Sequence, residues 1–419
     1  MMNRRDFIKA ALATASLSYL FTGSTFAQRS VTISAMQTFL QSGDALYELV
    51  QQYAALGFHR VGTDVDRHTN DWFSQILQNI GGEISMQPFS FTRFDGYSRV
   101  RISGKEVPSM PLYYEGIGNM SSSSPFVGSA VALRGDRTSA ALQRLITSAQ
   151  TSGARIAVIA TQCELGELQV PNREPRLGSG LPVVLVPGRL GESLQKKSVD
   201  VLFSGKIVPG KSNNIIATFG DVSKKAIIIA TPLSGWFQCA AERGTGIALA
   251  LGLAQALAEQ YPVIVIGSPG HELLHHIGLE TLLKTNQFNP ALIVHLGANV
   301  ALTMRNKTDN TMVLAPGSNN PSMIPAIARG VSIRMDDARF KKIEPILLGA
   351  GLPALLNPKQ WNGEGALWAS AVNAPLMSFV GIGPQFHTPA DVPEQVTSPQ
   401  SLETVHQMLL NAIQKYMQA

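Results

Sequence analysis

From Asn213 onward, apolar strands alternate with helical segments, and this pattern constrains the fold of the 419-residue chain more than any other feature. The expected strands read NNIIATF, KAIIIAT, YPVIVIG, PALIVHLGA and APLMSFVGIG, and the segments between and after them carry helical patterns such as GTGIALALGLAQALAEQ and SLETVHQMLLNAIQKYMQ. Strands rich in Ile, Val and Leu are typical of a parallel sheet that is buried on both faces. The alternation therefore predicts a three-layer α/β fold with a mainly parallel central sheet.

The residues before Asn213 divide into two parts. Residues 35–60 and 67–80 have apolar positions at helical spacing, and each run closes on glycine. From residue 98 to 212 the pattern changes to short strands, Gly/Pro turns and a strand–helix–strand unit with its own apolar positions. We therefore expect residues 98–212 to be an inserted domain, between an N-terminal part (28–97) and the main part (213–419) of one larger domain.

The N-terminus has the features of an export signal. Arg4-Arg5 is followed by Asp6-Phe7-Ile8-Lys9, an apolar run to Phe21 and a small residue at Ala27, which is typical of a twin-arginine leader of residues 1–27. Removing it takes away three positive charges and one negative, so the formal charge of +5 falls to +3. We expect a periplasmic or secreted protein without a stable membrane anchor, and this small charge does not indicate a nucleic-acid partner.

Polar side chains gather where the expected strands end. Glu242 follows one strand, His271 and Glu272 follow the next, His295 lies within a third, and His387 follows the last. In such a sheet, ligands bind beyond the carboxyl ends of the strands. His271 to His275 also match the zinc-protease pattern H-E-x-x-H, but Pro269-Gly270 places His271 at the very start of the helix, which disfavours a zinc helix.

With these strand ends and the closing motif His387-Thr388-Pro389-Ala390-Asp391, the chain resembles the zinc aminopeptidase family that includes the glutaminyl cyclases. The resemblance covers nearly the whole mature chain and implies a protease-associated domain at residues 98–212. It also implies one zinc ion held by Glu242, Glu272 and His387, with His271 as the proton acceptor and His295 beside the site. The substrate would be a peptide or amino-acid derivative.

The sequence departs from this family pattern at several positions, so other interpretations remain open. The family's His-x-Asp motif is missing, since Thr231 and Ser234 stand in that segment, and a paired-zinc site is not expected. Cys239 or Ser234 is an alternative nucleophile, and a non-catalytic relative that binds a peptide or partner in the same cleft is another. In the simpler structural interpretations, Glu272 caps a helix, Glu242 and Arg243 form a surface ion pair, and His275 and His276 lie on a helix directed away from the site.

Overall fold

The computed structural model describes residues 40–274, 276–319 and 327–419, so the expected leader and His275 lie outside the described residues. The helices are α2 (Gly43–Ala55), α3 (Asp64–Asn79), α4 (Ala140–Thr151), η2 (Gly188–Leu190), α5 (Gly191–Lys196), η3 (Ala240–Gly244), α6 (Thr245–Leu257), α7 (Ile277–Thr285), α8 (Asp337–Gly349), α9 (Gly365–Ala371), α10 (Pro393–Val396) and α11 (Pro399–Met417). Within the described residues, no helix is both long enough and apolar enough to cross a bilayer.

The strands of the large sheet are β1 (Glu83–Ile102), β2 (Lys105–Val107), β4 (Gly118–Ser122), β10 (Val199–Phe219), β11 (Ile227–Pro232), β12 (Val263–Ser268), β13 (Leu292–Ala298), β16 (Ala328–Arg334), β17 (Ala354–Leu356) and β18 (Leu376–Ile382). Their order is β17-β16-β18-β13-β11-β12-β10-β1-β2, and β4 pairs with β10. The four central strands β12, β11, β13 and β18 are parallel, and antiparallel pairs flank them. This arrangement confirms the predicted mainly parallel central sheet.

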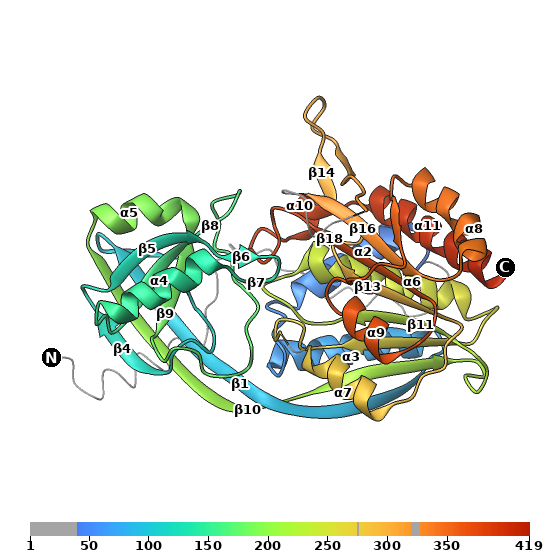
Figure 1. Cartoon of the computed structure of the whole chain (residues 1–419), viewed down its shortest axis with the longest axis horizontal. Helices are drawn as coiled ribbons and strands as arrows, with labels where there is room; N and C mark the ends of the chain where they lie inside the picture. The colour runs from blue at the N-terminus through green and yellow to red at the C-terminus, as the bar shows by residue number, and fades with distance from the viewer. Residues whose placement is uncertain (1–39, 275, 320–326) are drawn as a thin grey trace, which may run out of the picture. The chain divides into compact units, whose positions relative to one another are not determined.

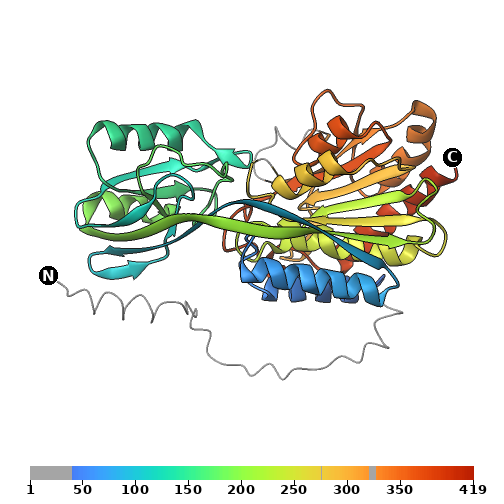
Figure 2. The same cartoon turned by 90° about the horizontal axis from the view of Figure 1, so that it is seen from below.

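Helices cover both faces of this sheet (Figures 1 and 2). In β11, Ile227 and Ile229 pack into the core shared with α2, α3, α6, α8 and α11, whereas Ile228 and Ala230 pack into the core shared with α7 and α9. Successive side chains of a strand point to opposite faces, so a strand with two buried faces must be apolar at every position. The continuous Ile/Val/Leu runs in the sequence have this origin, and they confirm the predicted α/β fold.

A second sheet lies in the segment between β1 and β10. Its strands are β3 (Met110–Pro111), β9 (Val183–Pro187), β8 (Ala157–Gln162) and β5 (Phe126–Val131), in that order, and they form a separate hydrophobic core with α4 and α5. Two small pairs complete the strands: β6 (Leu133–Arg134) with β7 (Arg137–Thr138), and β14 (Thr303–Arg305) with β15 (Met312–Leu314).

The long strands β1 and β10 pair antiparallel along their whole length, from Glu83↔Thr218 to Ile102↔Val199. The expected boundaries at residues 98 and 212 therefore fall inside continuous strands rather than in linkers. The division of the chain into domains stays a prediction.

Candidate functional site

Buried charged and histidine side chains gather near the carboxyl ends of β11, β12 and β13, in two groups. The first is called the Glu242 cluster and consists of Cys239, Glu242, Arg243, His387 and Asp391. The second is called the Glu364 cluster and consists of His271, His276 and Glu364, with His295 beside it. All of these residues except His276 are buried, and His276 is half-buried.

Arg243 is the centre of the Glu242 cluster. Its Nη2 lies 2.6 Å from Glu242 Oε1, and its other nitrogens donate to three backbone carbonyls, of Ser234, Glu242 and Gly297. Both side chains are almost completely buried, so the expected ion pair exists but is not on the surface. Burial alone would raise the pKa of Glu242, but the charges of Arg243 and His387 lower it to about 2. Glu242 is therefore a carboxylate that is already neutralised by a resident cation.

His387 faces an acceptor on each side of its ring. Its Nε2 lies 3.2 Å from Glu242 Oε1, and its Nδ1 lies 2.7 Å from the carbonyl oxygen of Val170. When Nδ1 donates to the Val170 carbonyl, the bond fixes the orientation of the ring and directs Nε2 at the Glu242 carboxylate. Figure 1 shows β18, the strand that leads into the His387 loop, within the large sheet.

Asp391 and Cys239 hold the start of the α6 region. The Asp391 carboxylate accepts hydrogen bonds from the backbone N–H groups of Ala241 and Glu242, in the manner of a helix cap. Burial raises the pKa of Asp391 to about 7 and raises the pKa of the Cys239 thiol well above its ordinary value. These contacts do not favour the alternative in which a helix N-terminus activates Cys239: the thiol is fully buried, and its Sγ lies 3.3 Å from Glu242 Oε2, to which it donates.

Glu272 forms hydrogen bonds with other residues than Glu242 does. Its Oε1 accepts from the backbone N–H of Val61, and its Oε2 accepts from the Ser234 hydroxyl, both at 2.6 Å. It does not cap α7, which begins at Ile277. Among the described residues, Glu242, Glu272 and His387 do not form a group whose ligand atoms all lie within 4.8 Å of one another. The structure thus brings Glu242 and His387 together but leaves Glu272 in a different hydrogen-bond network.

Two such groups occur among the described residues: Cys239, Glu242 and Asp391 in the Glu242 cluster, and His271, His276 and Glu364 in the Glu364 cluster. His271 Nδ1 lies 3.3 Å from Glu364 Oε1, and the rings of His271 and His276 have centroids 4.5 Å apart. His276 precedes α7 with a left-handed backbone (φ 44°), so the expectation that it lies on a helix directed away from the site is wrong. Irregular backbone before α7 turns its ring toward His271.

Glu364 was not among the residues predicted from the sequence. It stands between Gly363 and Gly365 at the start of α9, and a Cβ at Gly365 would overlap the hydroxyl of Ser378. Glycine at this position lets the start of α9 approach β18 and His295 closely. An acidic residue between two glycines at a helix start was the available signal, but nothing in the sequence linked it to His271, 93 residues away.

Burial controls the protonation of the Glu364 cluster. It raises the pKa of Glu364 to about 8, lowers the pKa of His295 to about 3 and lowers the pKa of His271 well below its ordinary value. At neutral pH without a bound ion, the neutral imidazoles of His271 and His295 therefore lie beside a Glu364 carboxyl group that retains its proton. Such an arrangement suits proton transfer, and it also suits a cation that would displace the proton.

One segment between β8 and β9 contacts the loops of both clusters. Val170 donates its N–H to the carbonyl of His387, Asn172 donates its side-chain amide to the carbonyl of His271, and Arg173 exchanges backbone hydrogen bonds with Glu272 and Leu274. These bonds fix the loops that follow β12 and β18. The segment expected to be an insertion thus helps to position the predicted site residues.

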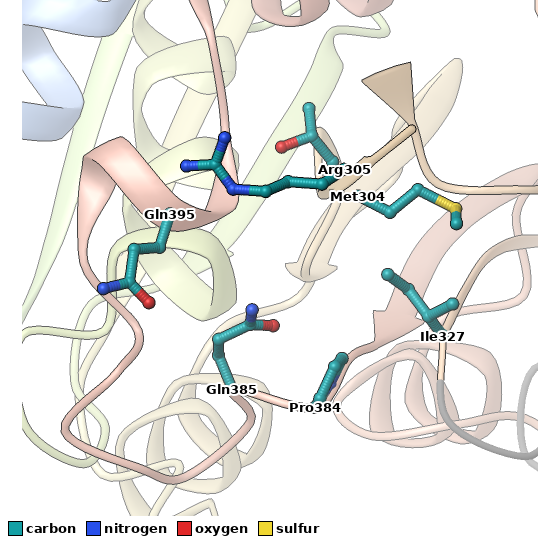
Figure 3. Close-up of a pocket in the computed structure, with 7 residues that line it drawn as sticks. Met304, Arg305, Ile327, Pro384, Gln385 and Gln395 are labelled. Atoms are coloured by element: carbon teal, nitrogen blue, oxygen red, sulfur yellow. The ribbon is translucent and has the colours of Figure 1, made fainter. Parts of the chain in front are cut away.

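A cavity of about 410 Å³ lies elsewhere (Figure 3). It is lined by Thr303, Met304, Arg305, Ile327, Pro384, Gln385 and Gln395. None of these residues belongs to either cluster, although Gln385 is only two positions before His387. The cavity therefore adjoins the loop after β18 without containing the buried acids and histidines.

A metal ion fits these two clusters unequally. Next to Glu242, an ion would face the Arg243 guanidinium, and the Asp391 carboxylate already accepts from two backbone N–H groups, so the Glu242 cluster is the poorer fit for a zinc ion. The Glu364 cluster offers two imidazoles and a carboxylate, which are zinc ligands, and its donors are close together.

Comparison with solved structures defines the class of fold. The chain superposes on a zinc aminopeptidase from Bacillus subtilis with a TM-score of 0.64 and 13% identity, covering 89% of this chain and 95% of that one. It superposes on a peptidase M28 precursor from Shewanella amazonensis with a TM-score of 0.62 and 15% identity, covering 92% and 95%. The protein therefore has the fold of the zinc aminopeptidases and M28 peptidases, which confirms the predicted resemblance at the level of the fold.

An aminopeptidase from an Aneurinibacillus strain has the same fold, with a TM-score of 0.55, 15% identity and coverage of 89% and 93%. No family model matches the sequence, and a search of curated proteins found no significant match. The fold is thus shared where the sequence has diverged, and the residues of the site have to be judged by their own chemistry.

Proposed function

We propose that the protein is a peptidase-like hydrolase that acts on a peptide or amino-acid derivative. The observation that supports this function is the meeting of His271, His276, His295 and Glu364 beyond the strands of an aminopeptidase-type sheet. In parallel α/β sheets this edge is where ligands bind, and buried groups with shifted pKa values are typical of catalytic sites.

Glu364 and Glu242 have different roles in this proposal. In the metal-free site, Glu364 is placed to exchange a proton with a substrate or a water molecule, because its carboxyl group is buried and lies 3.3 Å from a ring nitrogen of His271. With a zinc ion bound, Glu364 would be a ligand of the ion instead. A zinc ion bound there would polarise an amide carbonyl and lower the pKa of a bound water molecule. Glu242 has a supporting role, since its charge is neutralised by Arg243.

The test is turnover of a panel of aminoacyl-anilides and short peptides by the mature protein, with glutaminyl peptides included for the cyclase alternative. We expect release of the anilide or free amino acid by the wild type and a large loss in Glu364→Gln, with Glu242→Gln examined in parallel. Absence of turnover on every substrate at high enzyme concentration would overturn the hydrolase.

A second candidate is a relative that binds a peptide without cleaving it, and the Glu242–Arg243 pair favours it. That pair places a side-chain cation beside Glu242, where the sequence resemblance implied a zinc ion. In this case, the peptides of the panel raise the melting temperature, as a ligand of the native state must, while no product forms.

We also propose that the protein is exported. The twin-arginine pattern at Arg4-Arg5 supports this location, and fractionation of cells expressing the full chain tests it. We expect the mature protein in the periplasm or medium, and expect the double substitution Arg4→Lys, Arg5→Lys to retain it inside the cell. Equal export of both chains would contradict the proposal.

A further inference from the structure

We propose that one zinc ion binds to His271, His276 and Glu364, and that it does not bind at Glu242 and His387. The three side chains come from two separate segments, the loop after β12 and the start of α9, and their ligand atoms all lie within 4.8 Å of one another. His271 and Glu364 are buried and His276 is half-buried. This geometry is the basis of the assignment.

The distances in the cluster are close to those of a metal centre. Zinc binds imidazole nitrogen and carboxylate oxygen at about 2.1 Å in tetrahedral sites, so two ligand atoms of one ion lie about 3.4 Å apart. His271 Nδ1 and Glu364 Oε1 are separated by 3.3 Å. The ligand atom of His276 lies within 4.8 Å of both.

His295 supplies a second, independent observation. Its Nδ1 lies 2.8 Å from the Ser378 hydroxyl, and its Nε2 is buried, makes no hydrogen bond to the described residues, and lies 3.9 Å from Glu364 Oε2. A buried polar atom without a partner is costly and needs an explanation. If Nδ1 donates to Ser378, Nε2 carries the lone pair and faces the proposed site, where it can bind the ion or the ion's water.

The chemical types of the ligands indicate which class of metal ion would bind. Two imidazoles and one carboxylate form a ligand set of catalytic zinc sites, which Fe(II) also uses, whereas Mg²⁺ and Ca²⁺ prefer oxygen ligands alone. Three protein ligands leave a fourth position open, which is the arrangement of a catalytic rather than a structural zinc site. The charge of Arg243 is partly compensated by Glu242, which lies 2.6 Å from it.

This assignment rests on the proposed function only in placing the ion in the same site. A binding measurement tests the zinc site, and a turnover measurement tests the hydrolase. Zinc binding without turnover would overturn the hydrolase and leave the metal site standing. Turnover without zinc binding would overturn the metal site and leave the hydrolase standing.

The experiment is zinc titration of the metal-free mature protein by calorimetry, with metal content checked by mass spectrometry after dialysis. We expect the wild type to bind one equivalent of zinc. The dissociation constant should be at least ~100-fold larger in Glu364→Gln, because even the loss of an outer-shell partner lowers metal affinity 10–100-fold. His271→Gln tests the site a second time if Glu364→Gln does not fold. His387→Gln and the exposed His68→Gln are the matched controls, and both should bind zinc within about threefold of the wild type.

Spectroscopy identifies the ligands. X-ray absorption at the zinc edge should show imidazole and oxygen scatterers and no sulfur, because Cys239 belongs to the other cluster. The proposal is overturned if the wild type binds no zinc, if His387→Gln abolishes binding while Glu364→Gln retains it, or if sulfur is found among the ligands.

Discussion

Arg243 and Glu242 are neighbours in the sequence, and their side chains form an ion pair that is buried in the interior. Arg243 Nη2 lies 2.6 Å from Glu242 Oε1, and the guanidinium also donates to the carbonyls of Ser234 and Gly297. The pair joins the start of α6 to the ends of β11 and β13. It places a permanent positive charge beside a carboxylate that was predicted to be a zinc ligand.

The first prediction concerns this pair. Arg243→Met leaves the carboxylate of Glu242 buried with one cation fewer, and loss of one member of a buried pair costs about 3–5 kcal/mol of unfolding free energy. The double substitution Glu242→Met, Arg243→Met should recover most of that loss, because no charge is left buried. Urea denaturation of the three proteins measures both effects. A loss below about 1 kcal/mol in the single variant would contradict the buried ion pair.

A second prediction concerns the segment between β8 and β9. The side-chain carbonyl of Asn172 accepts from Trp236 Nε1 at 2.7 Å, and its amide donates to the carbonyl of His271 at 3.4 Å. Asn172→Ala leaves the buried indole N–H without its acceptor and should cost about 1–3 kcal/mol. Denaturation followed by tryptophan fluorescence measures the loss. Asn119→Ala, at an exposed position, is the control and should change stability by less than about 0.5 kcal/mol.

A third prediction concerns the pH dependence of stability. Burial raises the pKa of Asp66 from 3.8 to about 7, although its carboxylate accepts from the backbone N–H of Gly62. The folded protein therefore binds a proton that the unfolded chain releases near pH 4, and the stabilisation from this group falls as pH rises from about 4 to 7. Asp66→Asn cannot lose a proton, so it should gain up to ~4 kcal/mol relative to the wild type over this range. Denaturation of both proteins at pH 4, 5.5 and 7 tests this, and parallel pH profiles would refute it.

A fourth prediction concerns the two cysteines, both of which are free. Cys239 is fully buried with a raised pKa, whereas Cys163 is partly exposed. Ellman's reagent should therefore modify about one thiol in the native protein and two after unfolding, since reactivity needs an accessible thiolate. Peptide mapping should locate the native modification at Cys163. Loss of turnover in Cys239→Ala with an unchanged melting temperature would instead revive the thiol mechanism.

The sequence by itself determined the sheet. Strands that are buried on both faces have to be apolar at every position, so the runs around Ile229, Val265 and Val294 were visible as a local pattern. The chain order of the central strands β11, β12, β13 and β18 followed from the same pattern, whereas β16 and β17 were not predicted. Polar residues at strand ends indicated where a site would lie. Glu242 and His387 were found in this way, and the structure brings their side chains into contact.

The tertiary structure decided which of these residues share a site. Glu364 meets His271 only because Gly365 lets α9 pack closely against β18, and His276 turns toward both because its backbone is left-handed. Arg243 became part of the interior because three carbonyls from separate segments converge on its guanidinium. Local patterns report which face of an element is buried, but they carry no record of which distant side chains converge, and the chemistry of this site depends on that convergence.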